Sequence, residues 1–413
     1  MSTLNTGPSI KYYKKLSLWF NFNKFNVLQV YSGKVDIGQH ISSTLALICS
    51  KITGVNYNQI EVIRLNTDIS PDEGITASSL SVAVSGTAIK AASFTLKKEF
   101  FNYAIKRHKI LEENILFENG VIKDKLSNKS VSYWDFSITD KFQELEIPDT
   151  LIESEISKFS HINTKSIEIK TIKDIVTGQY KYVHDMYFPN MLHARIVRPP
   201  NYNSKLIKIN ENGLKILKEN NIQIFIKGSF IALLSVEEFL VVKYLDIIKK
   251  QIIWKDTKNL SNNSIFKALA ENEKDTLLVK SGGEAYHENI PDLNKFDNLD
   301  TFSLSSEYKK SYLMHATIGP SAACSYFNDK KFTVFSHSQS VFALKKSISK
   351  YFNIHEDKVT LKHIPGSGCY GHNGADDVSF EAALLSKEFP KRYILLKWTR
   401  EDEHCWEPYG SAS

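Results

Sequence analysis

The sequence predicts a mixed α/β fold, in which strands and helices alternate along most of the chain. Three observations support this prediction. The 413 residues are 42% hydrophobic and 12% aromatic, which is enough apolar surface for a sizeable core. Short runs rich in β-branched and aromatic residues alternate with segments of helical spacing. Glycine, proline and serine separate these runs, as is typical of turns between elements.

Charge and cysteine content exclude several classes of protein. The net charge of +6 is small for this length, and basic residues occur as scattered pairs, so we expect no nucleic-acid partner. The cysteines lie far apart and form no C-x-x-C pair, which argues against a disulfide scaffold, a zinc ribbon or an iron–sulfur cluster in this chain. No secretory leader or membrane-spanning run is visible, so we expect a cytoplasmic protein without direct membrane insertion.

The first region, residues 1–160, begins with a strand, a helix and a second strand. Residues 27–31 and 60–65 are rich in β-branched residues and predict the strands. Residues 41–53 have helical spacing that stops at Gly54, a suitable residue for a helix C-terminus. The first region therefore starts as an α/β unit.

The remainder of the first region predicts a longer helix and then a linker. A run rich in serine, alanine and threonine, residues 76–92, leads into a helix that ends near residue 106. Residues 137–165 are polar and weakly periodic. We therefore expect them to connect the first region to the second.

The second region, residues 165–285, predicts a small α/β module with its own core. Two strands are joined by a turn at Gly228. Ser235 and the glutamate three positions later fit a capping box, which would open a helix that runs to residue 250. A further strand follows at residues 251–254.

The third region, residues 290–413, alternates strands with helices around a glycine-rich loop. The expected elements are a strand, a helix, a strand, the loop, a helix and a strand, at residues 332–335, 340–352, 358–364, 366–374, 378–388 and 393–398. After the last strand, a charged segment contains Glu401, Asp402, Glu403, His404 and Cys405. Its spacing fits no standard metal site, so we predict a charged loop and no side-chain metal ligands.

The glycine-rich loop is the strongest candidate for a binding site. Successive backbone N–H groups between a strand and a helix can bind an anion. Gly366, Gly368 and Gly371 satisfy G-x-G-x-x-G, so a nucleotide-binding dehydrogenase is one interpretation. Two aspartates that follow argue against it, because they place carboxylates where a pyrophosphate would bind. A cradle for a different cofactor is favoured, and a purely structural turn stays open.

Two glutamines and a serine-rich run are further candidates. Gln339 precedes the helix at residues 340–352, and Gln39 lies between a strand and a helix, so either amide could offer a donor and an acceptor. Ser78, Ser79 and Ser81 open a helix and are suited to a phosphate or pterin. An ordinary surface glutamine and ordinary N-capping are the alternative interpretations.

Four ordered motifs resemble the xanthine dehydrogenase/aldehyde oxidase family, and most closely its branch of isoquinoline 1-oxidoreductase β subunits and nicotinate dehydrogenase large subunits. The segments that carry the resemblance are residues 33–39 with 76–81, residues 182–185 with 191–200, residues 315–321 with 338–339, and residues 368–377 with 398–403. The resemblance implies that residues 1–160 are a piece of the molybdopterin-binding domain, residues 165–285 an α/β hammerhead domain, and residues 290–413 the first molybdenum-cofactor-binding domain, incomplete at its C-terminus. At position 40 the family usually has a glycine, whereas this chain has histidine.

The resemblance also implies roles for individual residues. Gln39 would contact the pterin of molybdopterin, and Gln339 would reach toward a molybdenum ligand. The phosphate end of the pterin would be held by Ser78, Ser79 and Ser81. The backbone facing the metal would be that of Gly368, Cys369, Tyr370 and Gly371.

The function implied by the resemblance is that of a molybdopterin-binding subunit of a molybdenum hydroxylase. Such an enzyme oxidises an N-heteroaromatic or aldehyde substrate and passes electrons to a small [2Fe-2S] partner subunit. The pterin form, including a cytosine dinucleotide, is not determined by the sequence. The family's second cofactor domain, which carries the catalytic glutamate, is expected to lie on a second polypeptide, so we assign no catalytic residue. A non-catalytic truncated or split-gene fragment and the nucleotide-binding dehydrogenase are the alternatives.

Overall fold

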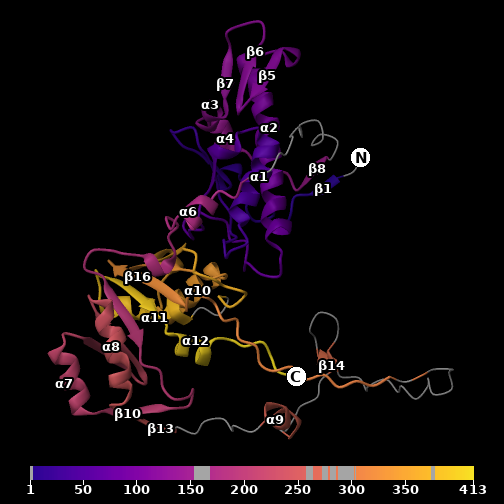
Figure 1. Ribbon diagram of the computed structural model, residues 1–413. Coiled ribbons are helices and arrows are strands. Elements are labelled where there is room, and N and C mark those ends of the chain that lie inside the picture. The colour runs from indigo at the N-terminus through magenta and orange to yellow at the C-terminus, as the bar shows by residue number, and fades with distance from the viewer. Residues whose placement is uncertain are drawn as a thin grey trace.

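The computed structural model has an N-terminal, mainly helical part above a part built on one large β-sheet (Figure 1). The described residues are 3–152, 168–256, 264–271, 278–279, 285–286, 302, 304–373 and 377–413. Among them, no helix is both long and apolar enough to cross a membrane. The mixed fold class predicted from the sequence is confirmed.

Two long helices form the frame of the N-terminal part. The first, α1 (Ile41–Thr53), has the predicted bounds and stops at Gly54, whose φ of 74° is the left-handed conformation typical of a helix end. The second, α2 (Thr87–His108), continues a π-helical turn, Val82–Gly86. A small sheet lies beside them and consists of β2 (Phe20–Phe22), β3 (Leu28–Val30) and β4 (Ile60–Val62).

Residues 115–152 complete this N-terminal part, and they include the first half of the predicted linker, residues 137–152. The strands β5 (Ile115–Glu118), β6 (Val121–Asp124) and β7 (Ser130–Ser132) form an antiparallel sheet, and the helices α3 (Tyr133–Ser137) and α4 (Asp140–Glu144) follow. The strand β8 (Thr150–Ile152) then pairs with β1 (Thr3–Asn5). The linker prediction is wrong for residues 137–152, because Phe142 and Leu151 are buried in the core. Residues 153–167 lie outside the described residues.

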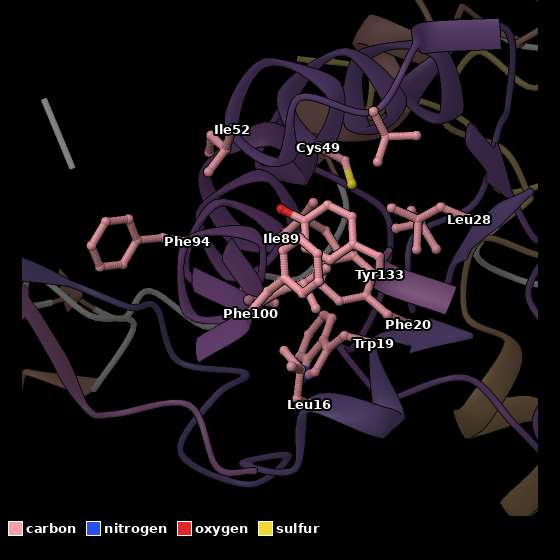
Figure 2. Packing of buried hydrophobic residues seen from close by; sticks show 14 of the residues in the cluster. Leu16, Trp19, Phe20, Leu28, Cys49, Ile52, Ile89, Phe94, Phe100 and Tyr133 are labelled. Carbon is pink, nitrogen blue, oxygen red and sulfur yellow. The ribbon is translucent and has the colours of Figure 1, made fainter. Parts of the chain in front are cut away.

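Aromatic side chains fill the core of the N-terminal part (Figure 2). The rings of Phe100 and Tyr133 have centroids 4.3 Å apart, and Trp19 and Phe20 are buried in the same cluster. The Tyr133 hydroxyl donates a hydrogen bond to the carbonyl oxygen of Thr53 over 3.0 Å. Thr53 is the last residue of α1, so this bond satisfies a carbonyl that has no partner within the helix.

A seven-stranded sheet spans the second and third regions of the sequence. Its strand order is β11-β12-β9-β19-β16-β17-β18, with parallel pairing between β9 and β19 and between β17 and β18. The bounds are β9 (Leu192–Ile196), β11 (Gln223–Lys227), β12 (Phe230–Ser235), β16 (Ala322–Asn328), β17 (Lys331–Ser336), β18 (Val359–His363) and β19 (Tyr393–Lys397). The sheet therefore crosses the expected boundary near residue 290, and the division of the chain into domains stays a prediction.

Helices pack on both faces of this sheet. The helix α8 (Glu238–Lys249) packs on β9 and β12 with a cluster that lies within the second region, as the predicted module requires. The helices α10 (Val341–Phe352) and α11 (Asp377–Glu388) pack on the strands of the third region. The remaining described elements are α6 (Ile172–Val176), α7 (Glu211–Glu219), α9 (Ile265–Glu271), α12 (Arg400–Trp406), β10 (Lys205–Ile209), β13 (Ile252–Lys255), β14 (Leu278–Val279) and β15 (Ala285–Tyr286).

The predicted capping box at the start of α8 is wrong. The N-cap of this helix is Glu237, and no side chain caps it. The Glu238 carboxylate instead accepts hydrogen bonds from Arg195 over 2.7 Å and from Lys397 over 3.1 Å. Glu238 at the start of α8 therefore forms salt bridges with β9 and β19 instead of a capping box with Ser235.

The N-terminal part joins the large sheet along the edge strand β18. The backbone N–H of His363 donates to the Leu65 carbonyl over 2.8 Å, and that of Thr67 donates to the Leu361 carbonyl over 3.0 Å. Asn66 and Lys362 form an antiparallel bridge between these bonds. Residues 65–67 therefore cover an edge that would otherwise expose unpaired backbone groups.

Replacing Tyr133 by phenylalanine tests the cap on α1. The change removes the hydroxyl and leaves the buried Thr53 carbonyl without its partner, so we expect the free energy of unfolding to fall by about 1–2 kcal/mol. Urea unfolding measures this loss. The control is Tyr12→Phe, because Tyr12 is 75% exposed, and an equal loss in both variants would contradict the assignment.

Candidate functional site

Two backbone segments far apart in sequence meet at Thr76 and Gln339. The Thr76 N–H donates to the Gln339 carbonyl over 3.0 Å, and the Gln339 side-chain Nε2 donates to the Thr76 carbonyl over 2.7 Å. Both residues are buried. The two bonds therefore fix the serine-rich run of the first region against the N-terminus of α10.

The same glutamine also holds the glycine-rich loop. The Cys369 thiol, which is buried, donates to Gln339 Oε1 over 3.1 Å. The Gln339 N–H donates to the Asn373 carbonyl over 3.0 Å. Gln339, predicted as a site residue, therefore connects two of the other predicted segments, and its amide uses both its donor and its acceptor for this.

Gln39 reaches the same assembly only indirectly. Its Nε2 donates to the Val35 carbonyl over 2.8 Å, and its Oε1 accepts from the Ile37 N–H over 2.7 Å. The Val35 N–H in turn donates to Thr76 Oγ1 over 3.0 Å. A chain of hydrogen bonds thus runs from Gln39 through Val35 and Thr76 to Gln339, although the exposed Gln39 side chain folds onto its own loop.

His40 adopts the conformation that the resemblance suggests for its position. Its φ is 54°, in the left-handed region where glycine is favoured. A glycine, which the family usually has at this position, would adopt this conformation without strain. The histidine meets the same backbone requirement at an energetic cost.

A buried carboxylate, Glu73, holds the predicted Gly33–Gln39 segment in place. Its Oε2 accepts from the Gly33 N–H over 2.8 Å and from the Ser32 hydroxyl over 3.2 Å, and it also accepts from the Ser85 hydroxyl. Lys34 Nζ donates to the Glu73 carbonyl over 2.7 Å. The sequence gives no signal for Glu73, because its partners are distant along the chain.

A cavity of about 400 Å³ lies between the Gly33–Gln39 segment and the glycine-rich loop. One wall contains Asp36, Gly38 and His40, and the other contains Gly366 and Gly368. Further lining residues are Ile37, Ile175, Tyr180, Tyr182, Ile318, Pro365, Ser367 and Tyr370. Two of the predicted segments therefore form opposite walls of one cavity.

The glycine-rich loop has a backbone conformation suited to close contact with a ligand. Gly368 and Gly371 have φ values of 118° and 96°, and Tyr370 between them has 55°. A Cβ at Gly366 would lie 2.5 Å from His337 Nδ1. Among the described residues, no acceptor pairs with the backbone N–H groups of residues 366–371. These donors beside the cavity fit an oxygen-rich cofactor such as a pterin.

The predicted serines lie near Thr76 but do not line this cavity. Ser78 and Ser79 are exposed, and each has a φ of 55°. Ser81 is partly buried at the start of the π-helical turn that leads into α2. Their proposed contact with a phosphate group stays a prediction.

Buried histidines surround the base of the loop and are held neutral. Desolvation lowers the pKa of both His337 and His363 to about 3. Asn373 Nδ2 lies 2.8 Å from His337 Nδ1 and donates to the His337 carbonyl over 3.1 Å. Burial also lowers the pKa of His184, whose Nε2 lies 2.6 Å from the Pro320 carbonyl.

The segment predicted to be a charged loop is instead a helix. Thr399 caps α12 with a capping box that includes Asp402. Glu403 and Glu407 are buried, one helical turn apart, and lie beside His372 of the glycine-rich loop. The sequence signal for this pair is the i, i+4 spacing of the two glutamates, which places both on one helix face.

Comparison with known proteins gives a match for the first region of the chain. Residues 3–171 match the family model described as "Molybdopterin cofactor-binding domain". A nicotinate dehydrogenase subunit of Pseudomonas putida is 26% identical over 415 residues, which cover 98% of this chain and 34% of that protein. The membrane-bound aldehyde dehydrogenase (pyrroloquinoline-quinone) of Gluconacetobacter polyoxogenes is 18% identical over 407 residues, which cover 96% of this chain and 52% of that protein. The chain thus spans about a third to a half of the length of these relatives.

Solved structures are similar to part of the chain. Quinoline 2-oxidoreductase from Pseudomonas putida 86 has a TM-score of 0.45 and 11% identity, and the match covers 59% of this chain and 35% of that chain. The aldehyde oxidoreductase from Desulfovibrio gigas has a TM-score of 0.45 and 13% identity, and the match covers 59% of this chain and 31% of that chain.

Replacing each glutamine by methionine tests which of them holds the assembly. Gln339→Met leaves the buried Thr76 carbonyl and the Cys369 thiol without partners, so we expect a loss of about 1–3 kcal/mol in the free energy of unfolding. Gln39→Met is the matched control, and we expect a change within about 0.5 kcal/mol because that side chain is exposed. Urea unfolding compares the two variants, and equal losses would contradict the role of Gln339.

The buried histidines make stability depend on pH. In the folded protein His337 and His363 have a pKa of about 3, below the ordinary value of 6.5. Because the unfolded chain binds more protons between these values, the free energy of unfolding falls as the pH drops from about 6.5 toward 3, by up to about 1.4 kcal/mol per pH unit for each histidine. Urea unfolding at several pH values measures this slope.

A pair of substitutions isolates the contribution of one histidine. We expect His363→Gln to reduce the slope by about one proton, because the titrating group is removed. Val176→Gln, at a side chain that is 73% exposed and does not titrate, should leave the slope unchanged. Identical slopes in the wild type and the His363 variant would show that His363 is not held neutral.

Proposed function

We propose that the chain is the molybdopterin-binding part of a molybdenum hydroxylase. The premise is that the chain carries a molybdopterin cofactor-binding domain. The family match and the nicotinate dehydrogenase relative confirm the expected resemblance to the xanthine dehydrogenase/aldehyde oxidase family. The observation that carries this proposal is the cavity whose walls come from the Gly33–Gln39 segment and the glycine-rich loop.

The residues around the cavity would hold the cofactor by hydrogen bonds rather than by metal coordination. The backbone N–H groups from Gly368 to Gly371 would face its oxygen atoms. Gln339 would fix the loop from below through Cys369, and Ser78 and Ser79 would bind the phosphate end. When bound, the cofactor supplies two-electron redox chemistry, while the protein orients it and shields it from water.

Gln39 would contact the cofactor only after a local rearrangement. Its amide is bonded to Val35 and Ile37, two partners on its own loop. A pterin in the cavity could replace these bonds, because the side chain is exposed and starts next to Gly38 of the cavity wall. Gln39 would therefore make the contact with the pterin that the resemblance implies once its two local hydrogen bonds are replaced.

For the whole enzyme we propose an N-heteroaromatic substrate or an aldehyde. The two curated relatives are named for nicotinate and for an aldehyde, respectively. Electrons would pass to [2Fe-2S] clusters on a small partner subunit. The general base would lie on sequence that corresponds to the part of the relatives outside this match, whether on the same or on a second polypeptide.

A cofactor-binding fragment without its own activity is the second candidate. The chain spans 34% and 52% of the length of the two relatives. In that case the chain would load cofactor but would oxidise substrate only with its complement. A nucleotide-binding dehydrogenase that uses Gly366, Gly368 and Gly371 would instead bind NAD and contain no molybdenum.

Cofactor loading tests the proposal directly. The full chain is produced in a host that makes molybdenum cofactor, with and without the small subunit, and molybdenum and pterin are measured per chain. We expect both in the wild type and a severalfold loss in Gly371→Val, because a β-branched residue at a φ of 96° moves the loop backbone.

The matched control is Gly228→Val. Gly228 also has a positive φ, 60°, and open space around it, but it lies in the turn between β11 and β12. The strain is therefore similar while the cavity is untouched. Equal loading of both variants would place the cofactor elsewhere, and NAD binding without molybdenum would favour the dehydrogenase.

A further inference from the structure

We infer that His372, Glu403 and Glu407 form a binding site for a divalent transition-metal ion, separate from the cofactor cavity. One possible ligand atom from each residue lies within 4.8 Å of the others, and all three residues are buried. None of the three lines the cavity beside the glycine-rich loop. The site would hold the ion through one imidazole nitrogen and two carboxylates.

The spacing of the possible ligand atoms of His372, Glu403 and Glu407 is compatible with coordination of one ion. His372 Nδ1 lies 3.2 Å from Glu403 Oε1. Ligands at about 2.0–2.2 Å from a tetrahedral ion are roughly that far from one another. The two glutamates come from α12 and the residue after it, where the Glu407 N–H donates to the Glu403 carbonyl over 3.1 Å. Helical geometry therefore fixes two ligands before any ion binds.

An unpartnered oxygen gives independent support for a ligand. Glu407 Oε2 is buried and has no hydrogen-bond partner among the described residues, although the Glu407 side chain is 0% exposed. Glu407 Oε1 accepts a hydrogen bond from the backbone N–H of His315 over 2.6 Å. A buried carboxylate oxygen without a partner is costly, and metal coordination would remove that cost.

The charge around the group points the same way. The Glu403 carboxylate accepts from the Ser321 N–H and hydroxyl, each over 3.0 Å, and these donors are neutral. Among the described residues, the side chains that pair with the two carboxylates as possible cations are His372 and His315. In the part of the chain that the structure describes, no lysine or arginine forms an ion pair with these two buried carboxylates, and a bound ion would compensate their charge.

The donor set favours a particular class of ion. Imidazole nitrogen with carboxylate oxygen suits Zn²⁺ and Mn²⁺, whereas Mg²⁺ prefers oxygen ligands and water. His372 Nδ1 lies 3.1 Å from Asn373 Oδ1 and 3.2 Å from Glu403 Oε1, so oxygen atoms surround this nitrogen. Because a metal ion binds only deprotonated imidazole and carboxylate groups, the affinity of this site would fall at low pH.

The bound ion would fasten the glycine-rich loop to the C-terminal helix. His372 directly follows Gly371 of the loop, and Glu403 lies on α12. The Ser321 bonds to Glu403 connect the same point to the start of β16. An ion at this place would thus make the position of the loop depend on α12.

The test is metal binding by the full chain after treatment with a chelator. A Cys405→Ser background removes the exposed thiol, which could bind Zn²⁺ adventitiously. Titration calorimetry with Zn²⁺ and Mn²⁺ should give one tight site per chain, with proton release, and the midpoint of thermal unfolding should rise with ion concentration. Mg²⁺ at equal concentration should leave the midpoint unchanged.

Conservative variants show whether these residues form the site. Glu407→Gln keeps the acceptor for the His315 N–H but removes the charge, and we expect a loss of at least tenfold in affinity. His372→Gln should give a similar loss and serves if the first variant does not fold. Glu401→Gln is the control, because Glu401 is exposed on the same helix.

Two results would overturn the inference. One is a wild-type chain that binds neither Zn²⁺ nor Mn²⁺ above the level of the Glu407→Gln variant. The other is equal affinity in the Glu401 and Glu407 variants. Neither result depends on molybdenum content, so failure here is distinguishable from failure of the proposed cofactor function.

Discussion

The reciprocal hydrogen bonds between Thr76 and Gln339 are the interaction on which the arrangement of the site depends. They join the N-terminal part to the segment between β17 and α10, and the two residues are 263 positions apart along the chain. Both residues are buried, so removing the hydrogen-bonding groups of one leaves the polar groups of the other without a partner and out of reach of water. The backbone bonds between residues 65–67 and β18 support the same junction. Hydrogen bonds from Val35 to Thr76 and from Cys369 to Gln339 connect this junction to the two segments that form the walls of the cavity.

The sequence was sufficient for elements whose pattern is local. The helix α1 has its predicted bounds because apolar spacing and Gly54 determine them without help from distant residues. The glycine-rich loop was also recognisable, since Gly368 and Gly371 occupy conformations that other residues adopt at a cost. The prediction failed for residues 137–152, where a polar, weakly periodic segment contributes Phe142 and Leu151 to the core. A few apolar residues in the right places outweighed the composition of that segment.

Partners that are distant in sequence account for the other failures. The predicted Ser235 capping box does not form, because Glu238 bonds to Arg195 and Lys397 instead. Only the folded sheet brings these two cations next to Glu238. Both glutamines were candidates from their positions before helices, yet only Gln339 is buried at the junction. Glu73 and the pair of Glu403 and Glu407 gave no sequence signal strong enough to identify their partners, because those partners lie on other elements. Tertiary contacts therefore decide which polar residues form the site.

Hydrogen exchange with and without the molybdenum cofactor tests the central claim most directly. The claim is that residues 33–40, 76–81 and 366–373 form one binding site across the Thr76–Gln339 junction. Mass spectrometry of peptides from the full chain compares the two states. The account predicts that backbone amides in all three segments gain protection together when cofactor is bound. Protection of only one segment, with the other two unchanged, would contradict it.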